Sequence, residues 1–476
     1  MSALRTAFNL AMLVCFFFGV THYAAMLLWG LLSTRLLRSP RAAIRDDPQE
    51  WTRRQSELPG VTMILPGYNE EATVVGAVSS ALRLDYPNLE VVVVNDGSKD
   101  RMVEVLVEAY DMIAMPTPIV QGPIHSAVVR RVFRSPHDPR LVLIDKAPAG
   151  AKADAANAGV NFATQEWIVI MDADELVESD ALMRCMTQVM HEPGNVVAVG
   201  ISLLPTNECV VQDLKMIEPR VAKNPWVGFQ TVEYLSAFFV SRPGMAQLRA
   251  LPIVSGGFGI FKRDAVRRLG GFKHPSLGED LDLVVRLNRL FLEAGEEYRI
   301  IQVPEAIAWT EFPPSHKVLR RQRMRWHRGL GQVLKDHGDT VGRPQYGTFG
   351  TLGMVQMWAF EWVSVFIEAF GYVLLIIMAL LGMLNYSVVF AMLCASQSLG
   401  LLISVSAVWT GSRYLNIYKG PRNTAMLIGW ACLSQFGYRQ MTVWWRIRSV
   451  FGKNATWGDM PRVGFAPSQN APRPNG

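Results

Sequence analysis

The sequence predicts an α/β domain with a doubly wound, mostly parallel sheet, flanked by transmembrane helices and by helices in the membrane interface. Two observations support this fold class. Strand-like and helix-like stretches alternate from Val61 to about Thr310, which is typical of a parallel sheet covered by helices on both faces. Half of the 476 residues are hydrophobic and only 18% are charged, which indicates membrane segments beside a soluble part.

Charge and cysteine content narrow the function classes. The net charge is +6, and in a membrane protein an excess of Lys and Arg more often marks cytoplasmic flanks than a nucleic-acid-binding surface. No motif for binding RNA or DNA is present in the sequence, so no nucleic-acid partner is expected. The five cysteines are scattered without metal-type spacing, which predicts a reduced cytosolic domain without a disulfide framework.

Residues 1–32 are expected to form one N-terminal transmembrane anchor. The run from Phe8 to Leu32 is almost wholly apolar and reaches the roughly 20 residues needed to cross a bilayer. A cleavable signal peptide is the alternative, but the run is long and lacks a clear small-residue cleavage site. Arginines cluster after the run, which predicts an external N-terminus and a cytoplasmic domain at the inner (plasma) membrane.

Residues 33–60, rich in Pro and charge, are expected to be a linker, and residues 61–312 the α/β domain. Polar residues fall at successive strand ends, which is where a parallel sheet places its ligand site. The segment 113–140 is rich in Pro and less regular. The expected strands include 61–65, 90–94, 141–146, 167–171 and 196–202, and the expected helices include 70–82, a stretch to about 112, 151–163 and a stretch from about 280 to 292.

The apolar run Trp167–Met171 reads as a buried strand that ends in acidic residues. Asp172 and Asp174 stand one residue apart at this sheet edge and can share one Mg²⁺ or Mn²⁺. Such a cation takes oxygen ligands and typically carries the phosphates of a substrate. The alternative is a strand that ends in a polar turn, with Asp172 or Asp174 capping the next helix.

The C-terminal part is expected to return to the membrane. Residues 313–350 should form interfacial helices with a basic cluster, 351–448 a transmembrane region with two to three spans, and 449–476 a tail. The runs 353–384 and 387–409 are long enough to span, whereas 425–445 is a weaker candidate. With three later spans the C-terminus would lie outside, yet the arginines and lysine after residue 445 favour the inside. The last segment is therefore re-entrant or interfacial, or the charge rule fails here.

Six short motifs occur in order and carry a resemblance to a known family. The chain resembles the membrane-embedded family-2 glycosyltransferases of the GT-A fold, which include poly-N-acetylglucosamine, hyaluronan, chitin-oligosaccharide and cellulose synthases. The resemblance covers about residues 60–330, and six motifs in order are not expected by chance. The motifs are Pro66-Gly67-Tyr68-Asn69-Glu70, Asn95-Asp96-Gly97-Ser98, Lys152-Ala153-Asp154-Ala155-Ala156-Asn157-Ala158-Gly159, Asp172-Ala173-Asp174, Glu279-Asp280 and Gln322-Arg323-Met324-Arg325-Trp326.

Sugar transfer from a nucleoside diphosphate requires that the leaving diphosphate be neutralised and that the acceptor hydroxyl lose its proton. Asp172 and Asp174 would hold the cation that acts as Lewis acid for the departing phosphate. Asp280 is the candidate general base, because a carboxylate within hydrogen-bond reach of the hydroxyl can accept its proton. The alternative is that Asp280 only caps the following helix.

The donor nucleotide-sugar, UDP-linked by resemblance, is expected to contact the strand ends and the basic cluster. Asp96 can accept a hydrogen bond from a uracil imide, with an Asx-turn as the alternative. Tyr68 can stack on the base and Glu70 can bond the ribose, or both belong to a turn; Lys152 can reach the base or diphosphate, or starts a solvated helix. The expected donor-binding residues are Pro66, Tyr68, Glu70, Asp96, Lys152, Asp172, Gln322, Arg325 and Trp326.

Two interpretations are open for the basic motif Gln322-Arg323-Met324-Arg325-Trp326. In the resembled family it contacts the donor, and the planar fork of Arg325 suits a diphosphate. Trp326 offers a flat face for a sugar at the acceptor end. The alternative is an interfacial helix whose Arg and Trp anchor at lipid headgroups. Expected acceptor-binding residues are Gly256, where glycine permits close approach of a ligand, Glu279 and Trp326.

The resemblance implies an inverting, metal-dependent glycosyltransferase that adds sugar to a growing polysaccharide at the cytoplasmic membrane face, with export through the spans as a further option. Gly278 stands where the polymer synthases usually have Thr, which leaves processivity open. A single addition to a lipid acceptor is the second hypothesis. The third is a transport subunit that only binds nucleotide-sugar, which would have no need of the base Asp280.

Overall fold

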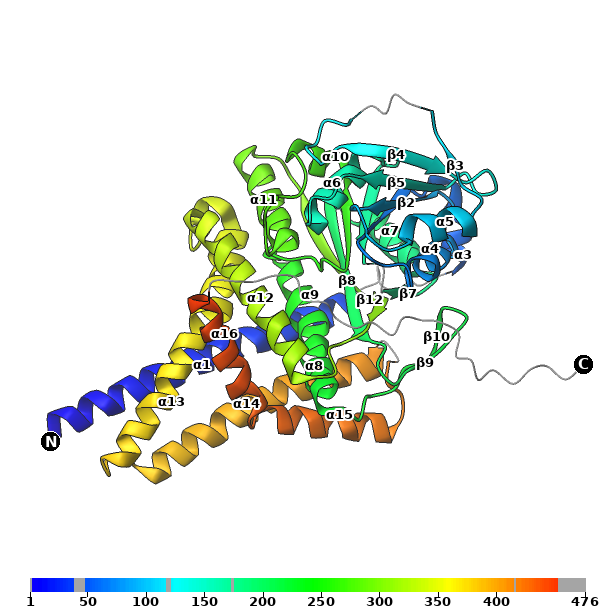
Figure 1. The fold of residues 1–476 in the computed structure, drawn as a ribbon. Coiled ribbons are helices and arrows are strands. Elements are labelled where there is room, and N and C mark those ends of the chain that lie inside the picture. The colour runs from blue at the N-terminus through cyan, green and yellow to red at the C-terminus, as the bar shows by residue number, and fades with distance from the viewer. Residues whose placement is uncertain (1, 38–47, 117–120, 173–174, 415–416, 453–476) are drawn as a thin grey trace, which may run out of the picture. The chain divides into compact units, whose positions relative to one another are not determined.

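The computed structural model describes residues 2–37, 48–116, 121–172, 175–414 and 417–452 (Figure 1). The chain divides into two compact units, and each is described by itself. Among the described residues, the sheet unit comprises those of 48–220 and 253–312, and the helical unit those of 2–37, 221–252 and 313–452. Residues 221–252, which the sequence places within the α/β domain, thus cluster with the helical unit.

The described part of the sheet unit contains one ten-stranded mixed sheet and one two-stranded hairpin. The long sheet is built from β1 (Val61–Gly67), β2 (Leu89–Asn95), β3 (Ile113–Ala114), β4 (Val129–Arg134), β5 (Leu141–Lys146), β6 (Trp167–Met171), β7 (Leu176–Val177), β8 (Val196–Pro205), β11 (Phe258–Lys262) and β12 (Arg299–Thr310). Its strand order is β3-β4-β5-β2-β1-β6-β11-β8-β12-β7. The hairpin pairs β9 (Val210–Gln212) with β10 (Lys215–Glu218).

The centre of the sheet is parallel, as the sequence predicts. Strands β5, β2, β1 and β6 pair in parallel, and their residues are almost all buried, because helices cover the faces of such a sheet. Strand β11 runs antiparallel to β6 and pairs Phe258 with Met171. The residues just before Phe258 therefore lie beside those just after Met171, and this register builds one wall of the candidate site.

The helices of the sheet unit follow most of the expected strands. They are α3 (Pro48–Arg54), a 3-10 turn (Gln55–Glu57), α4 (Val74–Leu82), α5 (Met102–Ala109), α6 (Lys152–Phe162), α7 (Ala181–His191), α10 (Arg263–Arg268) and α11 (Glu279–Glu293). Small residues bring α6 close to the sheet: a Cβ on Gly159 would lie 2.3 Å from Cγ2 of Ile64 in β1. This close packing fixes the start of α6 at the sheet edge.

Two local expectations differ from the structure. The helix expected at 70–82 begins only at Val74, because Asn69 has a positive φ of 57° and the carbonyl of Glu70 closes a turn onto the amide of Thr73. The expected linker 33–60 is partly helical in its described residues: the first helix extends to Leu37, and α3 forms just before β1. Residues 38–47 of that linker lie outside the described part of the chain.

The helical unit is built from α1 (Ser2–Leu37), α8 (Pro225–Ser236), η2 (Ala237–Ser241), α9 (Arg242–Gln247), α12 (His316–Asp336), η3 (Gly338–Thr340), η4 (Pro344–Tyr346), η5 (Phe349–Met354), η6 (Gln356–Val363), α13 (Ser364–Leu380), α14 (Tyr386–Tyr414), α15 (Pro421–Ser434) and α16 (Tyr438–Phe451). Local sequence explains where α8 begins. The side chain of Asn224 accepts a hydrogen bond from the amide of Trp226, and Pro225 occupies the first helical position.

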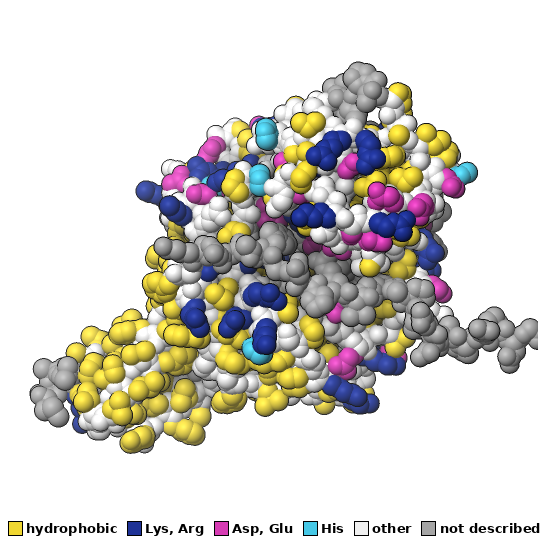
Figure 2. Space-filling view, in the orientation of Figure 1, with side chains coloured by type: hydrophobic (Ala, Val, Ile, Leu, Met, Phe, Trp, Pro, Cys, Tyr) yellow, Lys and Arg dark blue, Asp and Glu magenta, His cyan; other side chains and the backbone are white. Residues whose placement is uncertain are grey.

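Three helical segments of the described chain are long and apolar enough to cross a membrane: Arg5–Arg35, Phe349–Leu380 and Tyr386–Ser412. Figure 2 shows hydrophobic side chains gathered over the region of α1, α13 and α14. Leu380 is 82% exposed and Phe390 is 70% exposed, as expected for side chains that face lipid. One N-terminal and two C-terminal candidate spans agree with the layout that the sequence predicts.

The weaker candidate span, 425–445, is not one continuous helix. The chain breaks between Ser434 and Tyr438 into α15 and α16, each of 14 residues. Gly437 has a φ of 81° at this break, a conformation that favours glycine. At a rise of about 1.5 Å per residue each helix is about 21 Å long, shorter than the roughly 30 Å core of a bilayer.

Candidate active site

The sheet unit holds a pocket at the carboxyl ends of its central parallel strands. Lys152, Gly256, Glu279 and Asp280 are among the residues that line it, together with apolar side chains such as Phe272. The sequence names all four residues as candidates, from two separate motifs and one glycine-rich stretch. The structure brings them together because α6, the segment before β11, and α11 all begin at this edge of the sheet.

Lys152 and Asp172 form an ion pair at this edge. Asp172 directly follows β6, Lys152 is the first residue of α6, and Nζ of Lys152 lies 2.5 Å from Oδ1 of Asp172. Burial acts to lower the pKa of Lys152, but the carboxylates of Asp172 and Glu279 outweigh it, so the pKa lies above its ordinary value. Lys152 is therefore charged. Asp172 does not cap the next helix, α7, because Asp180 occupies its capping position.

Asp280 lines the same pocket. Helix α11 begins at Glu279, with Gly278 in the capping position, so Asp280 lies in the first turn and is not the capping residue. Its Oδ2 accepts a hydrogen bond from the amide of Gly256 across 3.1 Å, and its Oδ1 accepts one from the amide of Leu281 across 2.8 Å. The carboxylate is thus fixed in orientation by two backbone donors and remains partly exposed.

Gly256 joins the two halves of the site. Its carbonyl oxygen accepts a hydrogen bond from Nζ of Lys152 across 2.6 Å, while its amide bonds Asp280. A Cβ on Gly256 would lie 2.8 Å from Oδ2 of Asp280, so no larger residue fits without moving that carboxylate. The sequence predicts that a ligand approaches this glycine closely, and that contact remains a prediction.

Asp96 lies at the end of β2, where the sequence predicts a contact with the base, and it is only 4% exposed. Its carboxylate pairs with the ammonium group of Lys146 and accepts hydrogen bonds from the amides of Ala149 and Gly150 at 3.0 and 3.1 Å. Asp96 therefore fixes the loop that leads into α6 and Lys152. Its contact with a uracil remains a prediction.

Sequence reasoning missed Lys146. This side chain is fully buried and pairs with both Asp96 and Asp154, the latter at 2.8 Å. It is the last residue of β5, so a polar residue at the end of an apolar strand was the available signal. A buried ammonium between two carboxylates compensates charges that would be costly to bury alone.

Two predicted residues of the first motif, Tyr68 and Glu70, lie on the loop after β1. Tyr68 is 47% exposed, which leaves its ring accessible for stacking on a base. Glu70 accepts a hydrogen bond from the hydroxyl of Thr73 across 2.7 Å, in the turn before α4. Pro66 lies in β1 and pairs with Val94 of the neighbouring strand β2. Their roles in donor binding remain predictions.

The basic motif lies on α12 of the helical unit. Trp326 is 37% exposed, and the guanidinium of Arg323 lies over its ring at 5.0 Å. Arg323 also pairs with Glu233 of α8 at 2.6 Å, which ties the motif to a neighbouring helix. Gln322 and Arg325 lie in the same turns of α12 and are partly buried. The roles of Gln322, Arg325 and Trp326 remain predictions.

His327, which follows the motif, is buried and accepts a hydrogen bond at Nδ1 from Nε of Arg446 in α16, across 3.4 Å. Burial and the charge of Arg446 lower the pKa of His327 to about 3, so its ring is neutral. The ring also stacks on Trp362, with centroids 6.3 Å apart. His327 thus connects α12 with α16 within the helical unit.

The predicted metal pair is only half described. Asp172 is in place, and Asp174 lies outside the described residues. Within the described ranges no group of three or more His, Cys, Asp or Glu residues could hold a metal ion by itself. The Lys152 ammonium at 2.5 Å nevertheless marks a position where the carboxylate of Asp172 accepts a cation. A divalent ion that brings phosphate oxygens needs few protein ligands, so the residues present fit such a group.

The family model and the similar proteins that match this chain are all glycosyltransferases. The family model described as "Glycosyltransferase like family 2" matches residues 59–329. A poly-β-1,6-N-acetyl-D-glucosamine synthase from Staphylococcus epidermidis is 26% identical over 314 residues, which cover 65% of this chain and 64% of that protein. The synthase of the same name from Staphylococcus aureus strain COL is 25% identical over 318 residues, covering 66% of this chain and 65% of its own. The match thus spans just under two thirds of each relative's length.

A solved structure shares the fold. The mannosyltransferase from Pyrobaculum calidifontis, in complex with GDP-Man and Mn²⁺, has a TM-score of 0.51 at 20% sequence identity. The alignment covers 93% of this chain and 98% of that one. At this identity the likeness concerns the fold alone, and it supports the GT-A-like sheet with flanking helices.

Proposed function

The chain belongs to the glycosyltransferase-like family 2, and from this premise we propose that it transfers a sugar from a nucleoside-diphosphate donor to an acceptor at a membrane. The observation that carries the proposal is the grouping of Lys152, Asp172 and Asp280 around the peptide of Gly256. A cation, a cation-binding carboxylate and a second, separately held carboxylate supply what a leaving diphosphate and an acceptor hydroxyl require.

The leaving group is stabilised on the Asp172 side of the site. Asp172, with Asp174 as its sequence partner, would hold Mg²⁺ or Mn²⁺, which neutralises charge on the departing diphosphate when bound. Lys152 moves its ammonium from the carboxylate of Asp172 toward the phosphate oxygens, where a positive charge stabilises the same leaving group. Arg325 of the basic motif is assigned to the diphosphate and Gln322 to the donor, because a guanidinium fork matches phosphate geometry.

The nucleoside is assigned to the strand ends of the sheet unit. Tyr68 stacks on a uracil, Asp96 meets its imide, and Pro66 and Glu70 border the ribose. The exposed ring of Tyr68 and the fixed loop at Asp96 support this arrangement. The choice of UDP as the nucleotide of the proposed donor rests on the resemblance to the family.

The acceptor is activated by Asp280. Its carboxylate accepts the proton of the acceptor hydroxyl, whose oxygen forms a bond to the anomeric carbon while the bond from that carbon to the diphosphate oxygen breaks. Direct displacement of this kind inverts the anomeric centre. Gly256 and Glu279 lie beside Asp280 and are assigned to acceptor binding, and Trp326 to a flat contact with the acceptor sugar.

The activities named for the two relatives suggest which sugar donor and which product to test first. Both are poly-β-1,6-N-acetyl-D-glucosamine synthases, so UDP-N-acetylglucosamine and a growing polysaccharide are the first donor and acceptor to test. Addition of one sugar to a lipid remains the second candidate, because Gly278 replaces the Thr that is usual in polymer synthases. A non-catalytic nucleotide-sugar-binding subunit is the third.

The three candidate spans favour one topology at the plasma membrane. An N-terminus outside, followed by span Arg5–Arg35, places the sheet unit in the cytoplasm, and two later spans return the chain to the cytoplasm. Arg448 is then cytoplasmic, which agrees with the charge rule. Export of a polymer through the spans is a further part of the proposal.

The experiment is a transfer assay in nanodiscs with a panel of radiolabelled UDP- and GDP-sugars, each with Mn²⁺, Mg²⁺ or EDTA. The proposal predicts consumption of one UDP-sugar, dependent on metal. Product that resists chloroform–methanol extraction identifies polymer synthesis, and a single extractable glycolipid identifies the second candidate. If no donor is consumed although one binds, the chain is a binding subunit and the enzyme proposal is wrong.

A further inference from the structure

Helices α15 and α16 form a hairpin that turns back near the middle of the candidate spans. At the turn, the side chain of Gln435 lies against Gly400: a Cβ on Gly400 would lie 3.4 Å from Oε1 of Gln435 and 3.2 Å from the hydroxyl of Tyr23. Gly400 and Tyr23 each stand near the middle of a candidate span, Tyr386–Ser412 and Arg5–Arg35 respectively. The turn between α15 and α16 therefore lies at the level of the middle of these two candidate spans.

An ion pair marks the same depth. Arg439 lies in the first turn of α16. Its guanidinium binds both carboxylate oxygens of Glu368, at 2.8 and 3.0 Å, and donates to the hydroxyl of Tyr23 across 2.5 Å. Glu368 stands near the middle of the remaining candidate span, Phe349–Leu380. Ionisable groups at such depth are costly unless they pair with each other, and here they do.

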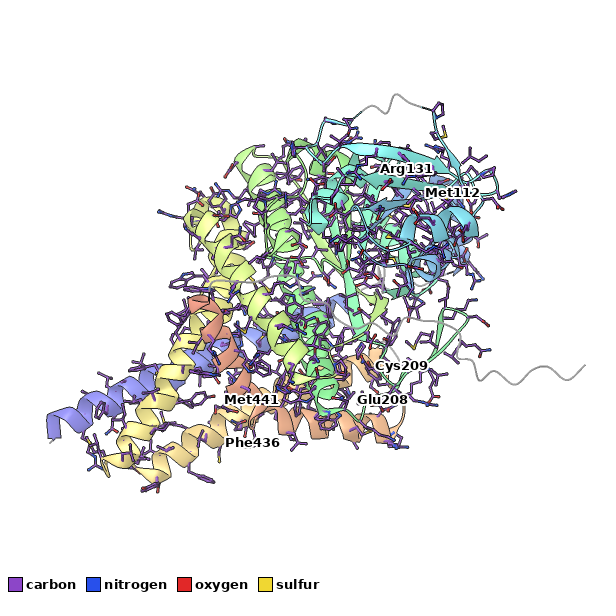
Figure 3. All side chains as sticks on the ribbon, in the orientation of Figure 1. Met112, Arg131, Glu208, Cys209, Phe436 and Met441 are labelled. Carbon is purple, nitrogen blue, oxygen red and sulfur yellow. The ribbon has the colours of Figure 1, made fainter. Side chains whose placement is uncertain are left out.

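The polarity of α16 is the reverse of that of a helix on a water-facing surface. Its exposed stripe carries Met441, Trp444 and Phe451, with Phe436 at the turn 71% exposed and Trp444 58% exposed. Two of its three arginines point inward: Arg439 pairs with Glu368 and Arg446 with Glu361, whereas Arg448 near its end is exposed. Figure 3 labels Phe436 and Met441 on this part of the hairpin. Apolar side chains outside and paired charges inside indicate a lipid environment.

We propose that residues 421–451 form a re-entrant hairpin in the bilayer, which enters and leaves on the side where α14 ends. Lipid acyl chains cover the exposed stripe of α16 and the turn at Phe436. Helices of about 21 Å are long enough to reach mid-membrane and too short to cross it. This inference rests on the candidate spans and on contacts within the helical unit, and it is independent of the transferase activity.

The proposed hairpin corresponds to the re-entrant alternative for the last segment, under which the C-terminal basic residues obey the charge rule. A re-entrant segment adds no crossing, so Arg422 before it and Arg448 at its end lie on one side of the membrane. The turn between α13 and α14, with exposed Asn385, lies on the other side. The three positions therefore report the topology directly.

The test uses single-cysteine variants of the full chain with its five native cysteines replaced. Arg422→Cys, Phe436→Cys, Arg448→Cys and Asn385→Cys are treated with a membrane-impermeant maleimide in sealed vesicles of each orientation. We expect Arg422→Cys and Arg448→Cys to label from one side and Asn385→Cys from the other. Phe436→Cys should label from neither side until SDS unfolds the protein, which also confirms that its thiol can react.

Two results would overturn the proposal. Labelling of Arg448→Cys from the side of Asn385→Cys would mean that the segment crosses the membrane. Labelling of Phe436→Cys in sealed vesicles as fast as Arg422→Cys would place the hairpin on the aqueous surface. As an independent readout, acyl-chain-brominated phosphatidylcholine should quench less fluorescence in Trp444→Phe than in the wild type; an equal loss from both would also contradict a lipid-facing α16.

Discussion

The amide of Gly256 donates a hydrogen bond to Oδ2 of Asp280 across 3.1 Å. The carbonyl of the same residue accepts a hydrogen bond from Lys152, which pairs with Asp172. One backbone segment therefore sets the position of the proposed base relative to the proposed cation site. A side chain added at Gly256 would therefore disturb the proposed base directly.

Gly256→Ala should impair transfer more than donor binding. The added Cβ would lie 2.8 Å from Oδ2 of Asp280, so the carboxylate must move, and a displacement of about 1 Å can lower a rate about 100-fold. We expect kcat to fall by about 10- to 100-fold, with a small change in donor KM, in a steady-state assay.

Gly76→Ala in α4 is the matched control for this substitution. A Cβ there meets only Cδ2 of Leu214, at 4.0 Å, which is an ordinary contact. Its kcat should equal that of the wild type. Equal activity of Gly256→Ala and Gly76→Ala would show that the position of Asp280 does not limit the reaction.

Lys152→Gln should strengthen metal binding to the free protein and weaken donor binding. The ammonium occupies the cation side of Asp172, so its removal leaves the carboxylate open to a divalent ion. Loss of a positive charge near the diphosphate should raise donor KM at least tenfold, equivalent to about 1.4 kcal/mol. Mn²⁺ affinity, measured by calorimetry without donor, checks the first effect, and donor kinetics check the second.

Exposed Lys99 supplies the control, because Lys99→Gln changes the charge equally without touching Asp172. It should alter neither quantity. A Lys152→Gln protein that binds Mn²⁺ more weakly than the wild type would mean that the ammonium and the metal do not compete for Asp172.

The centre of the fold was predictable from sequence, because β1, β2, β5 and β6 are apolar runs buried on both faces. The strand-end positions of Asp96 and Asp172 followed from the same pattern. The meeting of Gly256 with Asp280 was not predictable. It depends on the antiparallel register of β11 beside β6, which a glycine-rich stretch does not specify.

Helix ends and the segment 425–445 show a second limit of prediction from the sequence. The expected helix at 70–82 loses its first turn to the positive φ of Asn69, which local periodicity cannot show. In 425–445 the apolar run hides a break, because the turn at Gly437 depends on contacts with other helices rather than on composition. Lys146 was missed because its two carboxylate partners come from separate segments.

Arg446→Gln should loosen the attachment of α16 to α12. Arg446 donates to His327 beside the basic motif and pairs with Glu361 at 3.5 Å. Removing one partner of a partly buried pair costs about 1–3 kcal/mol, so the midpoint of thermal denaturation should fall. Arg448→Gln, on the exposed side of the same helix, should leave the midpoint unchanged.

A double-mutant cycle with Glu361→Gln separates the pair from other effects. If Arg446 and Glu361 act together, the double variant should lose less stability than the sum of the two single variants. Additive losses would show that the pairing of Arg446 with Glu361 contributes nothing to the attachment of α16.

Glu178→Gln should change how stability depends on pH. Burial, followed by the charge of Asp180, raises the pKa of Glu178 from 4.5 to about 7 in the folded protein, where it bonds the indole of Trp309. Its protonated form stabilises the fold fully below about pH 4.5, and this stability is lost as the pH rises through about 7.

Glutamine cannot ionise, so Glu178→Gln should gain up to about 3 kcal/mol relative to the wild type between pH 5 and pH 8. Thermal denaturation across this range measures the difference, with exposed Glu297→Gln as the control. Parallel pH profiles of Glu178→Gln and the wild type would contradict the raised pKa.

The central claim is that Asp280 removes the proton of the acceptor hydroxyl at a site that binds the donor through other residues. The most direct test compares Asp280→Asn with the wild type in donor binding by calorimetry and in single-turnover transfer with metal. We predict donor affinity within a factor of about three and a transfer rate at least 100-fold lower, as expected for loss of a general base. Transfer by Asp280→Asn at the wild-type rate would contradict the account.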